Sequence, residues 1–471
     1  MNSAKLCCSR AAVSVTWALA VLLALCATSN AGLTDGVKKL VLPNGLTVLV
    51  LENHKAPVAT FNVFYRVGSR NEQFGKTGLS HLVEHLMFRG TRKLKPEEFS
   101  GIIQMNGGRD NAFTTADFTD YFEIINSHHL DVPIQLEADR MANFDPKGFT
   151  SEKAVVIEER RLRTDDNPED ALYEITQAQA YVAHPYHWPV IGWMHDIQGL
   201  TLQDALNYHR IYYSPQNAVV VAVGDFDARK VIEQIKENFA GIKNGPVPPP
   251  VTEVEPPQEG ERRVLLRHAA DLPAIVEGFH TPAHQSHDAF ALELLSQILA
   301  GGKSSRLYQT LVEQKQLVVD VDADYELLSF DPTMFWITAE LRPGVKPETV
   351  EKVIDDEIAQ LASKPVSEHE LQKAKNLEQS SFVFGQDSIF REAMMLGQYQ
   401  LIGGYQQLDQ YIPSINAVTA ADIQRVTSKY LIQSNRTVGV LQPTGLLPHQ
   451  GGGGPGGPVS HAPATELGVQ S

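Results

Sequence analysis

The chain has 471 residues, of which 43% are hydrophobic and 20% charged, a balance that excludes a wholly disordered or fibrous protein. Lys and Arg total 40 against 56 Asp and Glu, and the resulting formal charge of −16 argues against nucleic acid as a partner, because binding to phosphates needs a positive surface. A mean hydropathy of −0.19 excludes a protein with many membrane spans.

Residues 1–31 are predicted to be a secretory signal peptide. Lys5 and Arg10 precede an uncharged apolar stretch at residues 11–27, and Ser29-Asn30-Ala31 places small residues at the −3 and −1 positions of a cleavage site. An uncleaved membrane anchor is the alternative, which the short apolar core disfavours. We therefore expect an exported protein whose mature chain has no integral membrane span.

All three cysteines, Cys7, Cys8 and Cys26, lie in this predicted leader. The mature chain would then contain none, so it can fold in an oxidising compartment without disulfides. Thiol catalysis and cysteine-ligated metal are excluded for the same reason.

The first part of the mature chain mixes strands and helices. Alternating apolar residues predict strands at residues 38–42, 46–51 and 58–67, the first two joined by a hairpin turn at Asn44-Gly45. Helical periodicity follows at residues 78–88, 96–105, 130–143 and 151–163. Strands paired by hairpins, with helices inserted between them, indicate an α+β layer structure.

The helix predicted at residues 78–88 contains His81-Leu82-Val83-Glu84-His85. Positions i, i+3 and i+4 of a helix share one face, so His81, Glu84 and His85 are expected to lie together. Two neutral imidazoles at this spacing can bind one Zn²⁺, and the adjacent carboxylate can take a proton from water that the metal activates. The motif is the inverted HxxEH arrangement. A chance pentapeptide on an amphipathic helix is the alternative.

A catalytic zinc also needs a third protein ligand, which must come from another segment. In a helix over residues 151–163, one inward stripe would contain Glu152, Val155, Val156, Glu159 and Leu162, with Lys153, Arg160 and Arg161 outside. Burying two unpaired carboxylates is unfavourable, and a metal would remove that penalty. We predict Glu159 as the ligand, with Glu158 as second choice, and Glu152 as the support of a ligand histidine. Solvated carboxylates on a helix rim are the alternative.

A Pro- and Gly-rich segment at residues 244–260 is predicted to be a semi-rigid linker. It separates an N-terminal half, residues 32–243, from a C-terminal half, residues 261–444. Residues 445–471 are dominated by Gly and Pro and are expected to form a disordered tail.

The two halves resemble each other. At a constant offset of 218, residues 201–223 and 419–441 match at Thr201 and Thr419, Asp204 and Asp422, Tyr212 and Tyr430, Asn217 and Asn435, and Val220 and Val438. Both segments run from a capped helix through a turn into a strand, which indicates a duplication. The corresponding helix of the second half, near residues 291–299, lacks the HxxEH motif, so that half is predicted to be catalytically inactive.

A phosphate-binding loop is suggested only superficially by Gly301-Gly302-Lys303-Ser304-Ser305. The earlier glycine that such a loop requires is replaced by Gln297. We therefore predict a turn that ends a helix and reject nucleotide hydrolysis.

Five segments together resemble the M16 family of zinc metallopeptidases, which includes pitrilysin, insulin-degrading enzyme and the mitochondrial processing peptidase. They are GLSHLVEHLMFRGT, NAFTT, EKAVVIEERR, HPYHWPVIGW and YYSPQNAVVVAVGDF. The resemblance covers about residues 36–445, and the length and two-half layout of the chain resemble those of the shorter bacterial subfamily. It implies two homologous α+β halves, each a mainly antiparallel sheet with helices packed on it.

The resemblance also assigns roles. It implies His81, His85 and Glu159 as ligands of one Zn²⁺ per chain, Glu84 as general base and Glu152 as the supporting carboxylate. The segment containing His184 is expected to be structural. The substrate-binding residues would be those of an edge strand with which an extended peptide pairs: Asn111, Ala112, Phe113 and Thr114. An ordinary edge strand is the alternative for this segment.

The implied function is that of a zinc endopeptidase acting on peptides or unfolded segments in the periplasm of a Gram-negative bacterium. Active family members commonly take an Arg and a Tyr from a C-terminal half to hold the substrate, and this pair is not evident in residues 325–349. A homologous partner subunit or a homodimer is therefore expected. The alternative function is a non-catalytic assembly or scaffold subunit with the same fold.

Overall fold

The computed structural model describes residues 32–445, so the predicted signal peptide and residues 446–471 of the predicted tail lie outside the described residues. Residues 37–445 belong to one compact unit. In the preceding unit, residues 32–36 form a turn in which the backbone N–H of Asp35 donates to the carbonyl of Gly32. Among the helices of residues 32–445, none has both the length and the hydropathy that crossing a membrane requires.

The first sheet has six strands in the order β1-β2-β6-β3-β5-β4. Its central strand β3 pairs with antiparallel neighbours on both sides, with Val63 opposite Val220 and Tyr121. Only β2 and β6 are parallel. The strands are β1 Lys38–Val41, β2 Thr47–Glu52, β3 Val58–Tyr65, β4 Arg109–Thr114, β5 Thr119–Asn126 and β6 Ala218–Gly224.

The second sheet repeats this topology with five strands in the order β7-β11-β8-β10-β9. Again one pair, β7 and β11, is parallel and the others are antiparallel. The strands are β7 Arg262–His268, β8 Ala274–Thr281, β9 Val318–Tyr325, β10 Thr333–Leu341 and β11 Arg436–Pro443. The predicted fold class, two α+β halves with mainly antiparallel sheets, is confirmed.

Helices pack on both sheets. In the N-terminal half they are α2 Leu79–Met87, α3 Glu98–Met105, α4 Asp131–Ala142, α5 Phe149–Arg160, α6 Pro168–Ala180, α7 Met194–Gly199, α8 Leu202–Tyr212 and α9 Ala228–Phe239. In the C-terminal half they are α10 Ala289–Ala300, α11 Pro347–Ser363, α12 Glu368–Gly385, α13 Ile389–Ile402, α14 Tyr411–Ala417 and α15 Ala420–Tyr430. Two π-helical segments lie at Arg161–Asp165 and Tyr308–Gln314. The predicted bounds in the N-terminal half differ from these by no more than three residues.

The duplication is visible in the helix caps. The hydroxyl of Thr201 accepts from the backbone N–H of Asp204 at the start of α8, and Thr419 does the same with Asp422 at the start of α15. Each helix then leads into a strand of its sheet, β6 or β11, which lies between a parallel and an antiparallel neighbour. A capped helix followed by such a strand therefore occurs once in each half.

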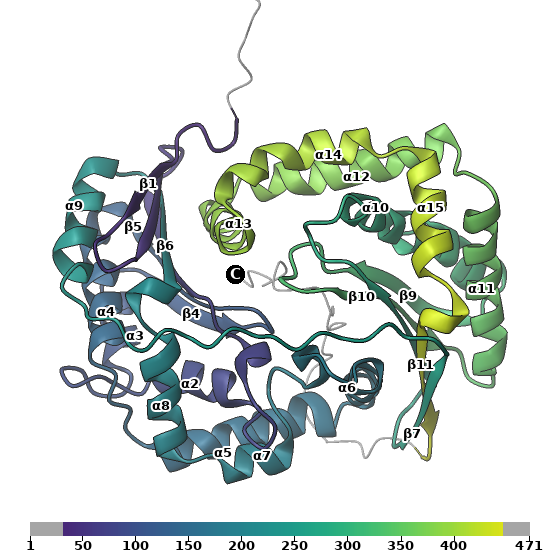
Figure 1. The fold of residues 1–471 in the computed structure, drawn as a ribbon, viewed down its shortest axis with the longest axis horizontal. Helices are drawn as coiled ribbons and strands as arrows, with labels where there is room; N and C mark the ends of the chain where they lie inside the picture. The colour runs from purple at the N-terminus through teal and green to yellow at the C-terminus, as the bar shows by residue number, and fades with distance from the viewer. Residues whose placement is uncertain (1–31, 446–471) are drawn as a thin grey trace, which may run out of the picture. The chain divides into compact units, whose positions relative to one another are not determined.

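The two halves exchange helices. Helix α6 packs on β7, β8 and β11, and α13 packs on β3 and β6 (Figure 1). Both contacts are close: a Cβ added to Gly397 in α13 would lie 2.2 Å from the ring of Phe64, and one added to Gly439 in β11 would lie 1.9 Å from Oγ1 of Thr176 in α6. One hydrophobic core accordingly contains residues of both halves. Glycine at these two positions lets helix and sheet approach each other.

One expectation for α5 is wrong. Val155 and Leu162, predicted to face inward, are 50% and 65% exposed, whereas Arg160, predicted to face outward, is only 5% exposed. The α-helix ends at Arg160 and continues as a π-helix, whose wider turn moves Leu162 off the inward face. Arg160 is buried because its charge is paired with Glu174 at 2.8 Å.

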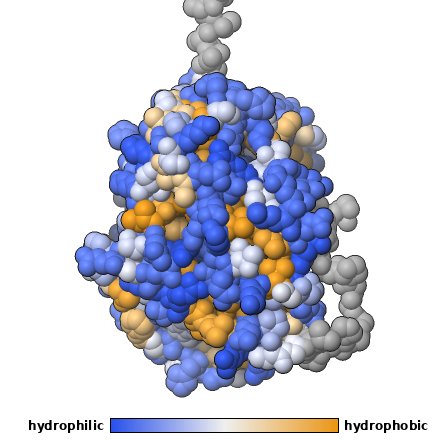
Figure 2. All heavy atoms as spheres, turned by 90° about the vertical axis from the view of Figure 1, so that its right-hand side faces the viewer, coloured by the Kyte–Doolittle hydropathy of each residue, from blue (hydrophilic) through white to orange (hydrophobic). Residues whose placement is uncertain are grey.

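The face shown in Figure 2 is hydrophilic over most of its area. Its apolar side chains gather in several separate patches among the polar ones. Some apolar surface is normal for a folded protein, because its polar groups cannot cover the whole surface.

Candidate functional site

Helix α2 is held at its first turn by a buried carboxylate. Glu72 accepts hydrogen bonds from the backbone N–H groups of Gly78 at 2.7 Å and Ser80 at 2.6 Å. These are donors that a helix N-terminus otherwise leaves unpaired. The hydroxyls of Ser80 and Tyr208 lie 2.7 Å apart and fasten the same turn to α8. The helix is therefore fixed at the residues just before its HxxEH motif.

Three side chains predicted as metal ligands lie together. The Nε2 atoms of His81 and His85 are 3.7 and 3.2 Å from Oε2 of Glu159. Each residue offers one ligand atom such that all of these atoms lie within 4.8 Å of one another. Among residues 32–445, no other group of three or more His, Cys, Asp or Glu side chains has this geometry.

These residues fit a zinc ion. Two ligands bound tetrahedrally at about 2.1 Å are separated by roughly 3.4 Å, close to the separations of Glu159 from the two imidazoles. Burial and the neighbouring His85 lower the pKa of His81 to about 3, which keeps that imidazole in the neutral form that ligates metals. Two nitrogens and one carboxylate leave a fourth position open, as in catalytic zinc sites.

The pKa values of the other two residues reflect their mutual contact. Burial alone would raise the pKa of Glu159, but the hydrogen bond with His85 and the charges of His81 and Arg163 lower it to about 2. Burial opposes the charging of His85, but its hydrogen bonds with Glu152 and Glu159 raise its pKa to about 9. A metal binding here would displace the proton of His85.

Glu152 supports His85 from the side away from Glu159. Its Oε1 lies 3.1 Å from Nδ1 of His85, and its Oε2 lies 2.8 Å from Nε of Arg89. Arg163 lies 3.1 Å from Oε1 of Glu159, the oxygen that does not face the histidines. Neither arginine was predicted from the sequence. Each follows a site residue by four positions, a spacing that places side chains together on a helix and could have indicated both.

The alternative ligand Glu158 lies elsewhere. Its side chain is 62% exposed and pairs with Arg161. It belongs to no group of potential metal ligands within residues 32–445. The geometry therefore favours Glu159, while the roles of both residues remain predictions.

Glu84 faces the sheet. Only 8% of it is exposed, and its Oε2 accepts a hydrogen bond from Oγ1 of Thr114 at 2.5 Å. Burial raises the pKa of Glu84 above its usual value, which favours the carboxyl form that can hold a proton. A carboxylate beside candidate metal ligands, with its proton affinity raised, suits a general base.

The predicted substrate strand is β4, at the edge of the first sheet. It pairs with β5 on one side only, with Ala112 opposite Tyr121 and Thr114 opposite Thr119. Asn111 is exposed, and its side-chain oxygen accepts from the backbone N–H of Ala112. The free edge leaves backbone groups that a peptide could pair with, so substrate binding by Asn111, Ala112, Phe113 and Thr114 stays a prediction.

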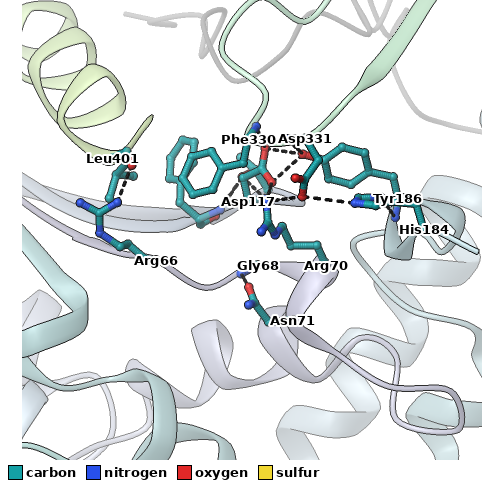
Figure 3. Close-up of polar contacts among 12 residues, drawn as sticks. Arg66, Gly68, Arg70, Asn71, Asp117, His184, Tyr186, Phe330, Asp331 and Leu401 are labelled. Atoms are coloured by element: carbon teal, nitrogen blue, oxygen red, sulfur yellow. Dashed lines mark hydrogen bonds and ion pairs between the residues drawn. The ribbon is translucent and has the colours of Figure 1, made fainter. Parts of the chain in front are cut away.

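The turn after β4 is joined to the C-terminal half by a buried polar cluster (Figure 3). Asp117 accepts from the hydroxyl of Tyr186 at 2.7 Å and from the backbone N–H of Phe330 at 3.0 Å. Arg70 contacts both Asp117, at 3.2 Å, and Asp331, at 2.7 Å. His184 lies 3.2 Å from Asp331 through Nε2, so it takes part in this cluster and not in the metal group.

The second half presents no comparable group in the described part of the chain. Helix α10 stands at the position of α2 but contributes no residue to a cluster of potential metal ligands. After α10, the backbone N–H of Ser305 donates to the carbonyl of Gly302, which forms a turn at the segment that superficially suggests a phosphate loop.

The structure has two α+β halves and places the HxxEH helix beside a glutamate of a second helix. HxxEH is the inverted motif of one class of zinc metallopeptidases. A family model described as Insulinase (Peptidase family M16) matches residues 47–192, and one described as Peptidase M16 inactive domain matches residues 199–378. A Helicobacter pylori protein named Zinc protease PqqE is 36% identical over 414 residues, which cover 86% of this chain and 93% of that protein. The chain belongs to the M16 peptidase family.

Other similarities agree with this assignment. The crystal structure of a protease from Helicobacter pylori matches with a TM-score of 0.84 and 35% identity, over 86% of this chain and 99% of that one. A putative M16-like peptidase from Alicyclobacillus acidocaldarius shares the fold, with a TM-score of 0.76 and 18% identity over 87% and 98% of the two chains. An uncharacterized zinc protease of Streptomyces coelicolor is 27% identical over 405 residues, 84% of this chain and 87% of that protein. The predicted family is confirmed.

Proposed function

We propose that this chain is a zinc-dependent endopeptidase that hydrolyses peptides or unfolded segments. The observation that carries the proposal is the convergence of His81, His85 and Glu159, with ligand atoms all within 4.8 Å, beside the buried carboxylate of Glu84. Membership of the M16 family and the relatives named zinc proteases support a peptidase role. One Zn²⁺ per chain is proposed, held by these three residues.

When bound, zinc would supply a Lewis acid that polarises the substrate carbonyl and acidifies a water molecule. Glu84 accepts a proton from the attacking water and passes it to the leaving amine. Glu152 holds His85 in the orientation that presents Nε2 to the site, through the 3.1 Å contact at Nδ1. The edge of β4 aligns the substrate backbone by strand pairing. Water is the nucleophile, so no acyl-enzyme forms.

We further propose that a homologous partner subunit, or a second copy of this chain, covers the site. The exchange of α6 and α13 puts residues of both halves into one core, so the halves cannot separate around a substrate without exposing that core. A cover over the edge of β4 would then come from another chain. Mass measurement of the intact assembly tests this: full activity from a demonstrated monomer would contradict it.

We also propose, from the sequence of residues 1–31, that the protein is exported to the periplasm of a Gram-negative cell and that these residues are removed. Mass measurement and N-terminal sequencing of the protein purified from its native periplasm test it. A mature N-terminus at Gly32 is expected, and a chain that starts at Met1 would contradict cleavage.

The enzymatic function is tested by measuring zinc content and peptide cleavage in the wild type and in the Glu84→Gln variant. We expect one zinc per chain in both the wild type and the variant, with hydrolysis reduced by at least about 100-fold in the variant. Glu158→Gln, which changes an exposed carboxylate on α5, is the matched control and is expected to retain activity. The scaffold alternative predicts no bound zinc and no cleavage that depends on Glu84.

A further inference from the structure

The hydroxyl of Thr114 is hydrogen-bonded to the proposed general base. Oγ1 of Thr114 lies 2.5 Å from Oε2 of Glu84. An ionised carboxylate has only acceptor sites, so the hydroxyl is the donor, and a short bond to a charged group is among the stronger hydrogen bonds in proteins. Glu84 is 8% exposed, so little water competes for this oxygen.

The direction of the Thr114 side chain follows from the pleat of β4. Alternate residues of a strand point to the same face, so Thr114 and Ala112 share one. Ala112 belongs to the buried core of the first half, and α2 packs against β4. The side chain of Thr114 therefore points beneath α2, whereas the free backbone edge of β4 points away from the sheet.

The position of Thr114 is fixed without any substrate. It is the last residue of β4 and pairs with Thr119 across the hairpin, where the backbone N–H of Thr115 donates to the carbonyl of Phe118. The hydroxyl of Thr119 is directed to the carbonyl of Val67 at 2.8 Å and lies 3.5 Å from that of Thr114. Because threonine is branched at Cβ, its side chain has few rotamers in a strand.

We propose that Thr114 is a positioning residue that holds the carboxylate of Glu84 in its working orientation. The proposal rests on the proposed function of Glu84. It gives β4 two separate roles: its backbone edge pairs with the substrate, and the side chain of Thr114 donates a hydrogen bond to the general base. A glutamate has three rotatable side-chain bonds, so a fixed donor restricts where its proton-accepting oxygen lies.

The test compares Thr114→Val, which keeps the shape but removes the hydroxyl, with Thr114→Ser, which keeps the hydroxyl. In the full-length protein we expect Thr114→Val to lower kcat by about 10-fold or more, with KM and zinc content unchanged, and Thr114→Ser to stay within about threefold of the wild type. Thr281→Val is the matched control: it removes a buried strand hydroxyl of the other half and is expected to keep wild-type kcat.

A second measurement separates positioning from substrate contact. If Thr114 acts through Glu84, then Thr114→Val has little further effect in a Glu84→Gln background. A raised KM with unchanged kcat in Thr114→Val, or wild-type kinetics, would overturn the proposal. Should Thr114→Val fold poorly, Thr114→Ala provides the same comparison, with circular dichroism as the check. Absent zinc, or unchanged activity in Glu84→Gln, would instead refute the proposed function itself.

Discussion

The carboxylate of Asp117, in the turn after β4, accepts a hydrogen bond from the backbone N–H of Phe330 in the other half at 3.0 Å. The same carboxylate accepts a hydrogen bond from the hydroxyl of Tyr186 and forms an ion pair with Arg70 (Figure 3). One buried acid therefore joins the segments that contain Phe330, Tyr186 and Arg70. Thr114 is three residues earlier. The C-terminal half, which offers no comparable ligand group among the described residues, thereby fixes the strand that lies against Glu84.

Replacing this acid tests its role. Asp117→Asn keeps the shape but loses the charge that pairs with Arg70, so we expect the free energy of unfolding to fall by about 2–4 kcal/mol. Urea unfolding measures this change. A second result is expected in catalysis: kcat falls while zinc content remains, because the turn after Thr114 loosens. Asp145→Asn, at an exposed surface pair, is the control and should change neither quantity.

The support of His85 by Glu152 predicts a change in metal affinity. Glu152→Gln removes the carboxylate 3.1 Å from Nδ1 of His85, and we expect zinc affinity to fall by about 10- to 100-fold, measured by competition with a chelator. Glu158→Gln should leave affinity unchanged. Equal affinities in the two variants would show that the contact with Glu152 does not orient the ligand.

Metal removal should affect both activity and stability. Dialysis against a strong chelator is expected to abolish hydrolysis and to lower the Tm, because the ion binds the folded chain and adds about 4 kcal/mol when present at 1,000 times its Kd. Zinc added back should restore both. Hydrolysis that persists in protein shown by elemental analysis to contain no zinc would contradict the proposed mechanism.

Asp288 should make stability depend on pH. Burial opposes its ionisation, but contacts from Tyr430, Arg425 and Lys429 lower its pKa to about 2. The unfolded state then binds the proton more tightly, so the stabilising contribution is present above about pH 4 and is lost as the pH falls toward 2. We expect Asp288→Asn to be about 1 kcal/mol less stable than the wild type at pH 7, with the difference shrinking on acidification. A difference independent of pH would refute this assignment.

The close contact between α13 and β3 predicts a steric effect. A Cβ at position 397 would lie 2.2 Å from the ring of Phe64, so Gly397→Ala should destabilise by about 1–3 kcal/mol through overpacking. Adding Phe64→Leu should recover part of the loss. Gly385→Ala is the control, because its Cβ would find its nearest neighbour 3.8 Å away, and helical Ala is expected to be neutral or stabilising. Thermal unfolding of the four proteins measures these differences.

Much of the fold could be predicted from local pattern. Alternation predicted β1, β2 and β3, and the hairpin at Asn44-Gly45 joins the first two in antiparallel register. The offset of 218 predicted equivalent capped helices, which occur at α8 and α15. The orientation of α5 could not be predicted in the same way, because Arg160 is buried by a partner, Glu174, on a different helix, and the helix changes its turn after Arg160.

In the site, the spacing of His81, Glu84 and His85 is enough to place them on one face, because the period of a helix sets that relationship. That Glu159, and not its neighbour Glu158, faces the imidazoles depends on the packing of α5 against α2, which turns one side of α5 toward the histidines. The contact of Thr114 with Glu84 and the exchange of helices between the halves depend on packing in the same way. Contacts between segments far apart in the chain depend on how helices and strands pack, and the local spacing of residues does not determine that packing.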